Sequence, residues 1–298
     1  MLRSCERPLV VGHRGARGLY PENTLSGFSK AIALGVDALE LDVAVAADNA
    51  PVVTHDPRLN PDIVRGSDGN WLDPPTPLIR ELTFEQLRAY DIGRLRPGSA
   101  YAAGLPEQRP ADGTRIPSLA EVVATTGQVP LLIEMKTFPG EPELAVAPVE
   151  MAELVLDVLS AASAMLRSMV VSFDWRGLRH LRRSHPEIAT GWLTQAMNDA
   201  ERRLWRGEQP GSRRAGSAAA IIAQEGGRWW LPEWGELLRQ DLAAAQQLGL
   251  WVVPWSVERP DQIHRAIEWG VDALITDRPD LALKIARGRK RARAPDVA

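Results

Sequence analysis

The sequence predicts an α/β fold, a (β/α)8 TIM barrel with an insertion after the second strand. Eight short apolar runs of strand length recur along the 298 residues, and helical patterns lie between most of them. Strands that alternate with helices indicate βαβ units and a parallel sheet, and eight such strands favour a closed barrel. The doubly wound open sheet is the weaker alternative, because no glycine-rich phosphate loop follows the first run.

The predicted barrel strands are mostly continuous apolar runs, which are typical of parallel strands buried on both faces. They are Leu9 to Val11, Ala38 to Ala46, Val129 to Ile133, Met169 to Phe173, Ala189 to Leu193, Ala218 to Ala223, Leu250 to Val253 and Ala273 to Ile275. A further strand, Pro51 to Thr54, follows the second run after a turn at Asp48 and Asn49 and is predicted to form a hairpin with it.

Helical patterns fill the spaces between the strands. The predicted helices are Thr24 to Leu34, Ala145 to Leu166, Trp175 to Arg183, Gly235 to Leu248, Pro260 to Trp269 and Pro279 to Ala286. Gly35 suits the end of the first helix, and Asp174 suits the N-cap of the third. Pro279 suits the first position of the last one.

Residues 57–117 are predicted to form an ordered insertion, rich in Pro, Gly and Asp, with one helical segment at Thr83 to Tyr90. Long loops of this kind in compact proteins are often functional. We therefore expect a single barrel domain over residues 1–286, followed by a basic tail at residues 287–298. A solvated tail is expected, and contact with anionic lipid is the alternative.

Composition excludes several classes of protein. Hydrophobic residues make up 45% and charged residues 24%, and the net charge of −3 does not favour nucleic acid as a partner. The only cysteine, Cys5, rules out an intrachain disulfide. No apolar run is long enough for stable membrane insertion. The N-terminus does not resemble a signal peptide, so a cytoplasmic location is expected; a removed signal leaves a periplasmic or secreted one open. The sequence carries no indication of oligomeric state.

Reactive side chains stand near the ends of four predicted strands. They are His13, Arg14, Glu40, Asp42, His55, Glu134 and Lys136. Glu40 and Asp42 are two residues apart on one strand, so their side chains point to the same side. Because the carboxyl ends of barrel strands meet at one mouth, we expect the whole set to converge there.

Three clustered carboxylates predict a site for a hard divalent cation. Glu40, Asp42 and Glu134 repel one another unless a cation neutralises them, and their oxygens suit Mg²⁺ or Ca²⁺. Zinc would prefer cysteine or histidine ligands. Such an ion can clamp a phosphoryl oxygen, and Arg14 and Lys136 can share the anionic charge. A plain salt bridge between Glu134 and Lys136 is the alternative for that pair.

The histidines divide into two groups. His13 and His55 flank strand ends beside acids, and they fit a general base and a general acid near neutral pH. The remaining three, His180, His185 and His264, lie on helical stretches and are interpreted as structural or surface residues.

Four segments together resemble the glycerophosphodiester phosphodiesterase family. They are VGHRGARGLYPENTLSGF, GVDALELDVAVAADNAPVVTHD, LLIEMK and GVDALITDRP, spread from Val11 to Pro279. The resemblance implies the barrel fold with its insertion after the second strand. It also implies that His13 and His55 are a catalytic histidine pair. The metal ligands would be Glu40, Asp42 and Glu134. The phosphate-binding cations would be Arg14 and Lys136.

The resemblance extends to neighbouring residues, with two departures. Glu22 and Asn23 would support the mouth, and Asn23 can also cap the helix that begins at Thr24. Trp255, in PWSVE, would line the substrate pocket, with plain packing as the alternative. The hairpin reads Ala-Ala-Asp-Asn at residues 46–49 where relatives usually have Thr-x-Asp-Gly, and Glu258 stands where relatives often have Asn.

The activity implied by the resemblance is that of a phosphoric diester hydrolase in lipid and glycerol metabolism. It is metal-dependent hydrolysis of a small-molecule glycerophosphodiester to sn-glycerol 3-phosphate and an alcohol. The alcohol, the choice between Mg²⁺ and Ca²⁺, and attack by water or by the glycerol 2-hydroxyl stay open; His13 is favoured as base and His55 as acid.

Two alternative functions remain. Lysophospholipase D-type hydrolysis of lysophospholipids would use the same site but needs an apolar channel, for which Trp229, Trp230 and Trp234 are candidate walls. A barrel that only binds phosphodiesters is disfavoured, because both histidines and all three acids are present.

Overall fold

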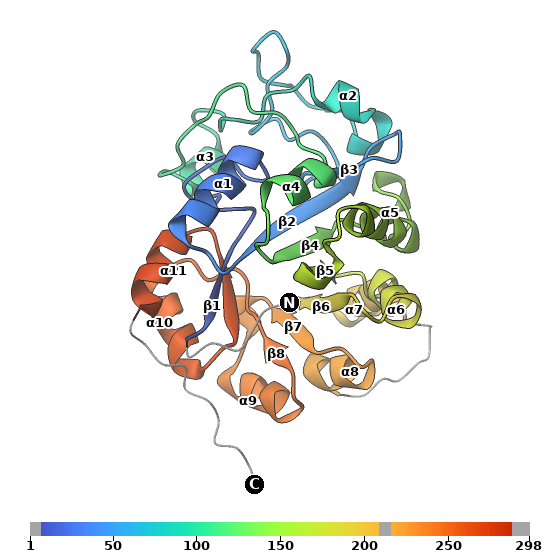
Figure 1. Ribbon diagram of the computed structural model, residues 1–298, viewed down its shortest axis with the longest axis vertical. Coiled ribbons are helices and arrows are strands. Elements are labelled where there is room, and N and C mark those ends of the chain that lie inside the picture. The colour runs from blue at the N-terminus through green and yellow to red at the C-terminus, as the bar shows by residue number, and fades with distance from the viewer. Residues whose placement is uncertain (1–6, 209–215, 288–298) are drawn as a thin grey trace.

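The computed structural model describes residues 7–208 and 216–287, and in it helices surround a barrel of strands (Figure 1). The parallel strands are β1 (Leu9–Gly12), β2 (Ala38–Val45), β4 (Leu131–Met135), β5 (Ser168–Ser172), β6 (Ala189–Thr194), β7 (Trp229–Pro232), β8 (Trp251–Val252) and β9 (Ala273–Thr276). They pair in the order β8-β7-β6-β5-β4-β2-β1-β9. Backbone hydrogen bonds from Asp272 N to Val252 O and from Ile275 N to Pro254 O, both 3.0 Å, join the two ends. The predicted TIM barrel is confirmed.

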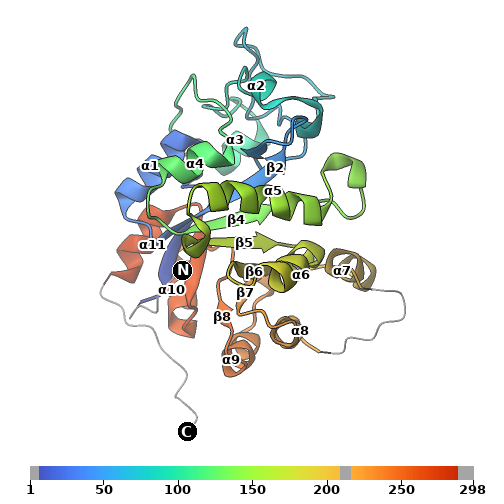
Figure 2. The same ribbon diagram turned by 45° about the vertical axis from the view of Figure 1, so that its right-hand side comes forward.

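The helices form the outer layer of the barrel (Figure 2). They are α1 (Leu25–Leu34), α2 (Phe84–Leu87), α3 (Ala100–Gly104), α4 (Leu119–Thr125), α5 (Pro148–Ala161), α6 (Trp175–Ser184), α7 (Asp199–Arg206), α8 (Ala218–Gln224), α9 (Arg239–Gln247), α10 (Pro260–Trp269) and α11 (Pro279–Ala286). Short 3-10 turns lie at Ile79–Glu81, Pro142–Leu144, Met165–Arg167 and Trp234–Glu236. Among the described residues, no helix is long and apolar enough to cross a membrane.

One predicted strand is wrong. The run from Ala218 to Ala223 is helix α8, and the barrel strand at this place is β7 at Trp229–Pro232. The Ser217 side chain accepts a hydrogen bond from Ala220 N and caps the helix. Three consecutive alanines at its start favour a helix, since alanine has the highest helix propensity. A short apolar run does not by itself distinguish a buried strand from a buried helix.

Side chains of the strands fill two apolar regions. Those that point into the barrel include Val11, Leu132, Val171 and Leu231, and their neighbours along the strands pack outward against the helices. Burial on both faces explains why these strands are continuously apolar in sequence.

The insertion lies beside the barrel, next to β2 and the antiparallel hairpin strand β3 (Pro51–Val53) (Figure 1). It contains α2 and α3 and has its own apolar cluster, which includes Leu59, Ile79, Leu87 and Ile116. The predicted helical segment Thr83 to Tyr90 is the shorter α2, with Thr83 as N-cap. The basic tail, apart from Arg287, lies outside the described residues.

Candidate active site

The three predicted metal ligands meet at the mouth of the barrel. Glu40 and Asp42 project from β2, and Asp42 stands in register with Glu134 on the neighbouring strand β4. One oxygen from each of the three carboxylates lies within 4.8 Å of the others. The sequence expectation that separate strands bring these acids to one place therefore agrees with the structure.

Two of these carboxylates carry oxygens that lack a hydrogen-bond donor. Glu40 is 3% exposed and Asp42 is 1% exposed, and Glu40 Oε1 and Asp42 Oδ1 have no hydrogen-bond partner among the described residues. Burial, reinforced by the charges of Asp42 and Glu134, raises the pKa of Glu40 well above its ordinary value. A buried polar atom without a partner is costly, and a divalent cation with oxygen ligands would satisfy these atoms.

Asp42 has cationic and amide neighbours on its other side. Arg14 Nε lies 3.1 Å from Asp42 Oδ2, Asn23 Nδ2 donates to the same oxygen at 2.9 Å, and Lys136 Nζ lies 3.6 Å from Oδ1. Burial alone would raise the pKa of Asp42, but the charges of Arg14, His55 and Lys136 outweigh burial and lower it. Asn23 is therefore hydrogen-bonded to a carboxylate of the mouth and does not cap α1. The N-cap is Thr24, whose side chain accepts a hydrogen bond from Gly27 N.

The two cations predicted to bind phosphate are paired with acids of the mouth. Arg14 Nη1 donates to Glu22 Oε1 at 2.7 Å, and Lys136 Nζ donates to Glu134 Oε1 at 2.7 Å. Tyr101, from α3 in the insertion, donates to Glu22 Oε2 at 2.5 Å. The insertion therefore contributes a side chain to the support of Arg14.

His13 is held by an acid that follows the last barrel strand. Its Nδ1 lies 2.6 Å from Asp277 Oδ1, and its Nε2 lies 3.8 Å from Glu40 Oε2. Burial lowers the pKa of His13, although Asp277 opposes that shift. Arg17 Nε also donates to Asp277 at 2.7 Å, and the charges of His13 and Arg17 lower the pKa of Asp277 to about 2 against the effect of burial.

His55 has an equivalent arrangement at the end of the hairpin strand. Its Nδ1 lies 2.7 Å from Asp56 Oδ1, and Asn60 Nδ2 donates to Asp56 Oδ2 at 2.7 Å. Burial would raise the pKa of Asp56, but the hydrogen bond with His55 outweighs it and lowers the pKa. The His55 side chain is 33% exposed, against 12% for His13, so His55 stands nearer to solvent.

Glu258 lies directly behind Asp277. Its Oε2 accepts a hydrogen bond from Asp277 N at 3.0 Å. Burial, reinforced by the charge of Asp277, raises the pKa of Glu258 to about 7. Relatives often have Asn at this position, so Glu258 adds a titratable group near His13.

Trp255 borders an aromatic region that includes Phe173 and Trp205. Its ring packs edge-on against Phe173 with 5.4 Å between ring centroids, and Phe173 packs in the same manner on Trp205 at 6.1 Å. Next to them is a pocket of about 380 Å³ whose lining includes Phe173, Met197 and Trp205. Polar side chains such as Arg202 share that lining.

The candidate lipid-channel tryptophans have mainly packing contacts. Trp230 is 6% exposed and donates to Thr194 Oγ1, and Trp234 is 8% exposed. Trp229 stacks on Trp251 with 4.6 Å between centroids. Only Trp230 among the three lines the pocket just described.

Sequence reasoning assigned no role to three residues of the site: Asp56, Tyr101 and Asp277. Asp277 follows β9 just as His13 follows β1, so the strand-end rule that found the other residues would have found it. Asp56 is adjacent to His55 in sequence. Tyr101 has no such signal, because its position depends on the folding of the insertion.

Comparisons with known proteins identify the family to which this chain is similar. Residues 13–281 match the model of the glycerophosphoryl diester phosphodiesterase family. A glycerophosphodiester phosphodiesterase of Caldanaerobacter subterraneus is 25% identical over 94% of this chain and 98% of its own length.

Two solved structures are similar over nearly the whole chain. A candidate glycerophosphoryl diester phosphodiesterase from Silicibacter pomeroyi has 34% identity and a TM-score of 0.86, covering 95% of both chains. A phosphodiesterase from Oleispira antarctica, in complex with its product sn-glycerol-3-phosphate, has 22% identity and a TM-score of 0.70, covering 94% of this chain and 96% of its own. The family match spans most of the sequence, and the chain therefore belongs to the glycerophosphoryl diester phosphodiesterase family.

Proposed function

We propose that this family member hydrolyses glycerophosphodiesters to sn-glycerol 3-phosphate and an alcohol, with a divalent cation and the His13–His55 pair. The observation that carries the proposal is the convergence of Glu40, Asp42 and Glu134 beside His13, with buried carboxylate oxygens that lack a donor. The product bound in the Oleispira antarctica relative is consistent with it.

The three carboxylates would hold Mg²⁺ or Ca²⁺, since all their ligand atoms are hard oxygens. When bound, such an ion supplies positive charge to the diester oxygens and to the charge that develops on them. Arg14 and Lys136 would bind the same phosphate group. Both already lie within 4 Å of Asp42, so they stand next to the proposed ion.

The two histidines would move the protons. A carboxylate at each Nδ1 keeps a proton on that nitrogen and leaves Nε2 facing the reaction. His13 Nε2, the more buried, takes the proton of the nucleophile as its oxygen bonds to phosphorus. His55 Nε2, nearer to solvent, gives a proton to the alcohol oxygen as its bond to phosphorus breaks.

The direct test uses metal-stripped protein and glycerophosphodiesters such as glycerophosphocholine. Adding Mg²⁺ or Ca²⁺ is expected to restore release of glycerol 3-phosphate, and His13→Ala or Glu40→Ala is expected to abolish it. Release that is unaffected by either substitution would contradict the proposed site.

The nucleophile is open to a separate experiment. Attack by water gives glycerol 3-phosphate in one step, whereas attack by the glycerol 2-hydroxyl gives a cyclic phosphate that water then opens. Detection of glycerol cyclic phosphate during turnover would exclude a route that uses water alone.

Substrate class is tested by comparing glycerophosphocholine with lysophosphatidylcholine. We expect faster hydrolysis of glycerophosphocholine, because the pocket beside Phe173 has Arg202 and Asp241 in its lining and is not a uniformly apolar channel. Faster hydrolysis of lysophosphatidylcholine would instead support the lysophospholipase D-type activity.

A further inference from the structure

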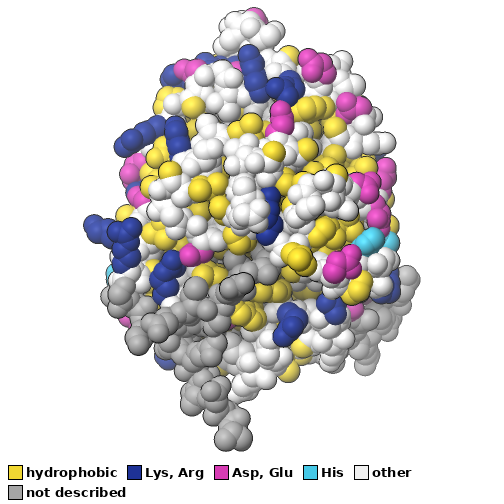
Figure 3. Space-filling view, viewed as in Figure 1, with side chains coloured by type: hydrophobic (Ala, Val, Ile, Leu, Met, Phe, Trp, Pro, Cys, Tyr) yellow, Lys and Arg dark blue, Asp and Glu magenta, His cyan; other side chains and the backbone are white. Residues whose placement is uncertain are grey.

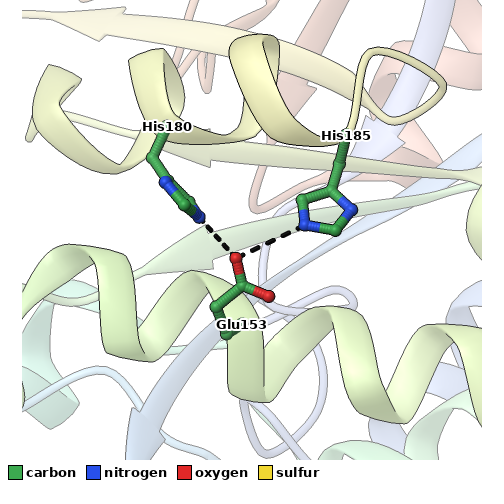
Figure 4. A group of neighbouring side chains, drawn as sticks. All are labelled: Glu153, His180 and His185. Atoms are coloured by element: carbon green, nitrogen blue, oxygen red, sulfur yellow. Dashed lines mark hydrogen bonds and ion pairs between the residues drawn. The ribbon is translucent and has the colours of Figure 1, made fainter.

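A second group of metal-ligand side chains lies in the outer helical layer, away from the mouth. Glu153 belongs to α5, His180 to α6, and His185 is the C-cap of α6. Helices α5 and α6 lie side by side in Figures 1 and 2. In Figure 4 the three side chains point toward one another across the space between these helices.

One carboxylate oxygen faces both imidazoles. His180 Nε2 is hydrogen-bonded to Glu153 Oε1, and His185 Nε2 lies 3.4 Å from the same oxygen. All three ligand atoms are within 4.8 Å of one another. Glu153 Oε1 therefore stands between the two imidazole nitrogens.

One of these separations is already that of a zinc site, and the others lie within reach of it. Ligand atoms about 2.0 to 2.1 Å from a tetrahedral zinc ion stand about 3.3 Å apart. The distance of 3.4 Å between His185 and Glu153 already fits. Small side-chain rotations would open the hydrogen bond from His180 and close the remaining gap.

The surroundings also suit a metal ion. His185 Nδ1 lies 3.8 Å from Glu187 Oε1, on the side of the ring away from Glu153. Zinc-binding histidines commonly have a carboxylate at the second nitrogen, which fixes the ring. The side chains of His180, His185 and Glu153 are 22%, 31% and 43% exposed, which leaves room for water as a fourth ligand. In Figure 3 histidine side chains reach the surface beside acidic ones over α5 and α6.

We propose that Glu153, His180 and His185 form a zinc site that joins α5 to α6. Two imidazoles and one carboxylate match zinc, whereas the three carboxylates at the mouth match Mg²⁺ or Ca²⁺. Interpretation of His180 and His185 as structural or surface residues accounts for their helical positions. The alternative is a carboxylate that only hydrogen-bonds and ion-pairs with the two imidazoles, and the titration below separates it from a zinc site.

The test is a calorimetric titration of the metal-free full chain with ZnCl₂. To weaken zinc binding at the mouth, the parent protein carries His13→Gln and Glu40→Gln. These substitutions remove one residue from each of the two groups of metal-ligand side chains there. We expect a zinc ion to bind this parent. Adding His180→Gln or His185→Gln is expected to weaken that binding at least ten-fold, while the control His264→Gln, on α10, leaves it unchanged.

Thermal unfolding provides a second measurement on the same proteins. Zinc is expected to raise the melting temperature of the parent and of the His264 control, because the ion would link two adjacent helices. It is expected to leave the His180 and His185 variants unchanged. Circular dichroism without zinc shows whether each variant is folded.

Two outcomes would overturn the site. One is a parent that binds no zinc, and the other is zinc binding of equal strength in folded parent, His180→Gln and His185→Gln proteins. The result does not depend on the proposed hydrolysis, because no substrate is present and the mouth is disabled.

Discussion

At the scale of single residues, both proposed catalytic histidines are held by a carboxylate in the same way. His13 and His55 each place Nδ1 within 2.7 Å of a carboxylate, that of Asp277 and that of Asp56. The carboxylate fixes the orientation and the tautomer of the ring. We infer that Asp277 and Asp56 are positioning residues, since they act through the imidazoles and not on the substrate.

Replacing Asp277 with Asn tests this role. The amide keeps a hydrogen-bond acceptor but loses the charge, so we expect kcat to fall about 10- to 100-fold, a fraction of the usual general-base contribution. Because Asp277 raises the pKa of His13, its loss should move the acidic limb of the pH–rate profile to lower pH. Asp280→Asn, at a carboxylate paired with Arg278, is the matched control. A drop in kcat without any movement of the acidic limb would mean that Asp277 is merely structural.

Glu258 gives a prediction about stability and pH. Its pKa is raised from 4.5 to about 7 by burial and by Asp277. The folded protein therefore binds a proton here that the unfolded chain releases, and its stability falls as the pH rises from about 4.5 to 7. Glu258→Gln removes this dependence. We expect the variant to match the parent near pH 4, below the unfolded pKa, and to exceed its unfolding free energy by about 1–3 kcal/mol at pH 8.

Urea denaturation at the two pH values provides the measurement for Glu258. The decisive quantity is the difference between variant and parent, since groups that do not interact with Glu258 titrate equally in both. An equal difference at both pH values would show that the carboxyl is ionised throughout and that its pKa is not raised.

At the scale of elements, the turn after β1 depends on Gly12. A Cβ atom at this position would lie 2.0 Å from the Gly15 carbonyl oxygen, which is too close for any side chain. The tight turn brings Arg14 into a left-handed conformation with φ of 48°, from which its N–H donates to Glu40 Oε2 at 2.9 Å. The turn thus sets the positions of His13 and Arg14 relative to β2.

Gly12→Ala is therefore expected to destabilise the fold by about 1–3 kcal/mol or more, because the backbone has to shift. The rate of product release should fall by more than the loss of folded protein explains, since His13 moves with the turn. Gly104→Ala is the control, because nothing lies within 4 Å of a Cβ at Gly104 and the residue belongs to α3. Thermal unfolding and product release measure the two effects. A Gly12→Ala protein with normal stability and rate would show that the turn is not constrained.

Sequence patterns predicted most elements of the barrel, and the exceptions have local causes. Helices α10 and α11 agree with their predicted bounds, because Pro at the first position marks both starts and Gly270 marks the end of α10. Helix α4 was missed although Ser118 and Glu121 form a capping box there. The predicted helix from Ala145 to Leu166 is shortened to α5, because Pro148 begins it and the chain turns after Ala161.

At the scale of the whole molecule, the site is a product of barrel topology. Strands distant in sequence deliver their polar ends to one mouth, and for this reason the convergence of Glu40, Asp42 and Glu134, the proposed ligands, was predictable from strand ends. Contacts across the insertion were not predictable, because Tyr101 reaches Glu22 only through the insertion's own packing. We propose that residues 1–286 form one domain and that the insertion is part of its active site.

Metal binding should also be visible in the stability of the whole barrel. Without a cation, Glu40 and Asp42 keep buried oxygens without donors, so metal that binds only the folded state should stabilise it by about 2.7 kcal/mol at a hundred times Kd. We expect a rise in melting temperature of roughly 5 °C with Mg²⁺ or Ca²⁺, measured by differential scanning calorimetry. Glu40→Gln should lose this rise but cost little without metal, because the neutral amide removes repulsion from Asp42 and Glu134. The parent and the Glu40→Gln variant would therefore have similar melting temperatures with chelator and different melting temperatures with metal. An equal rise in both would place the cation elsewhere in the protein.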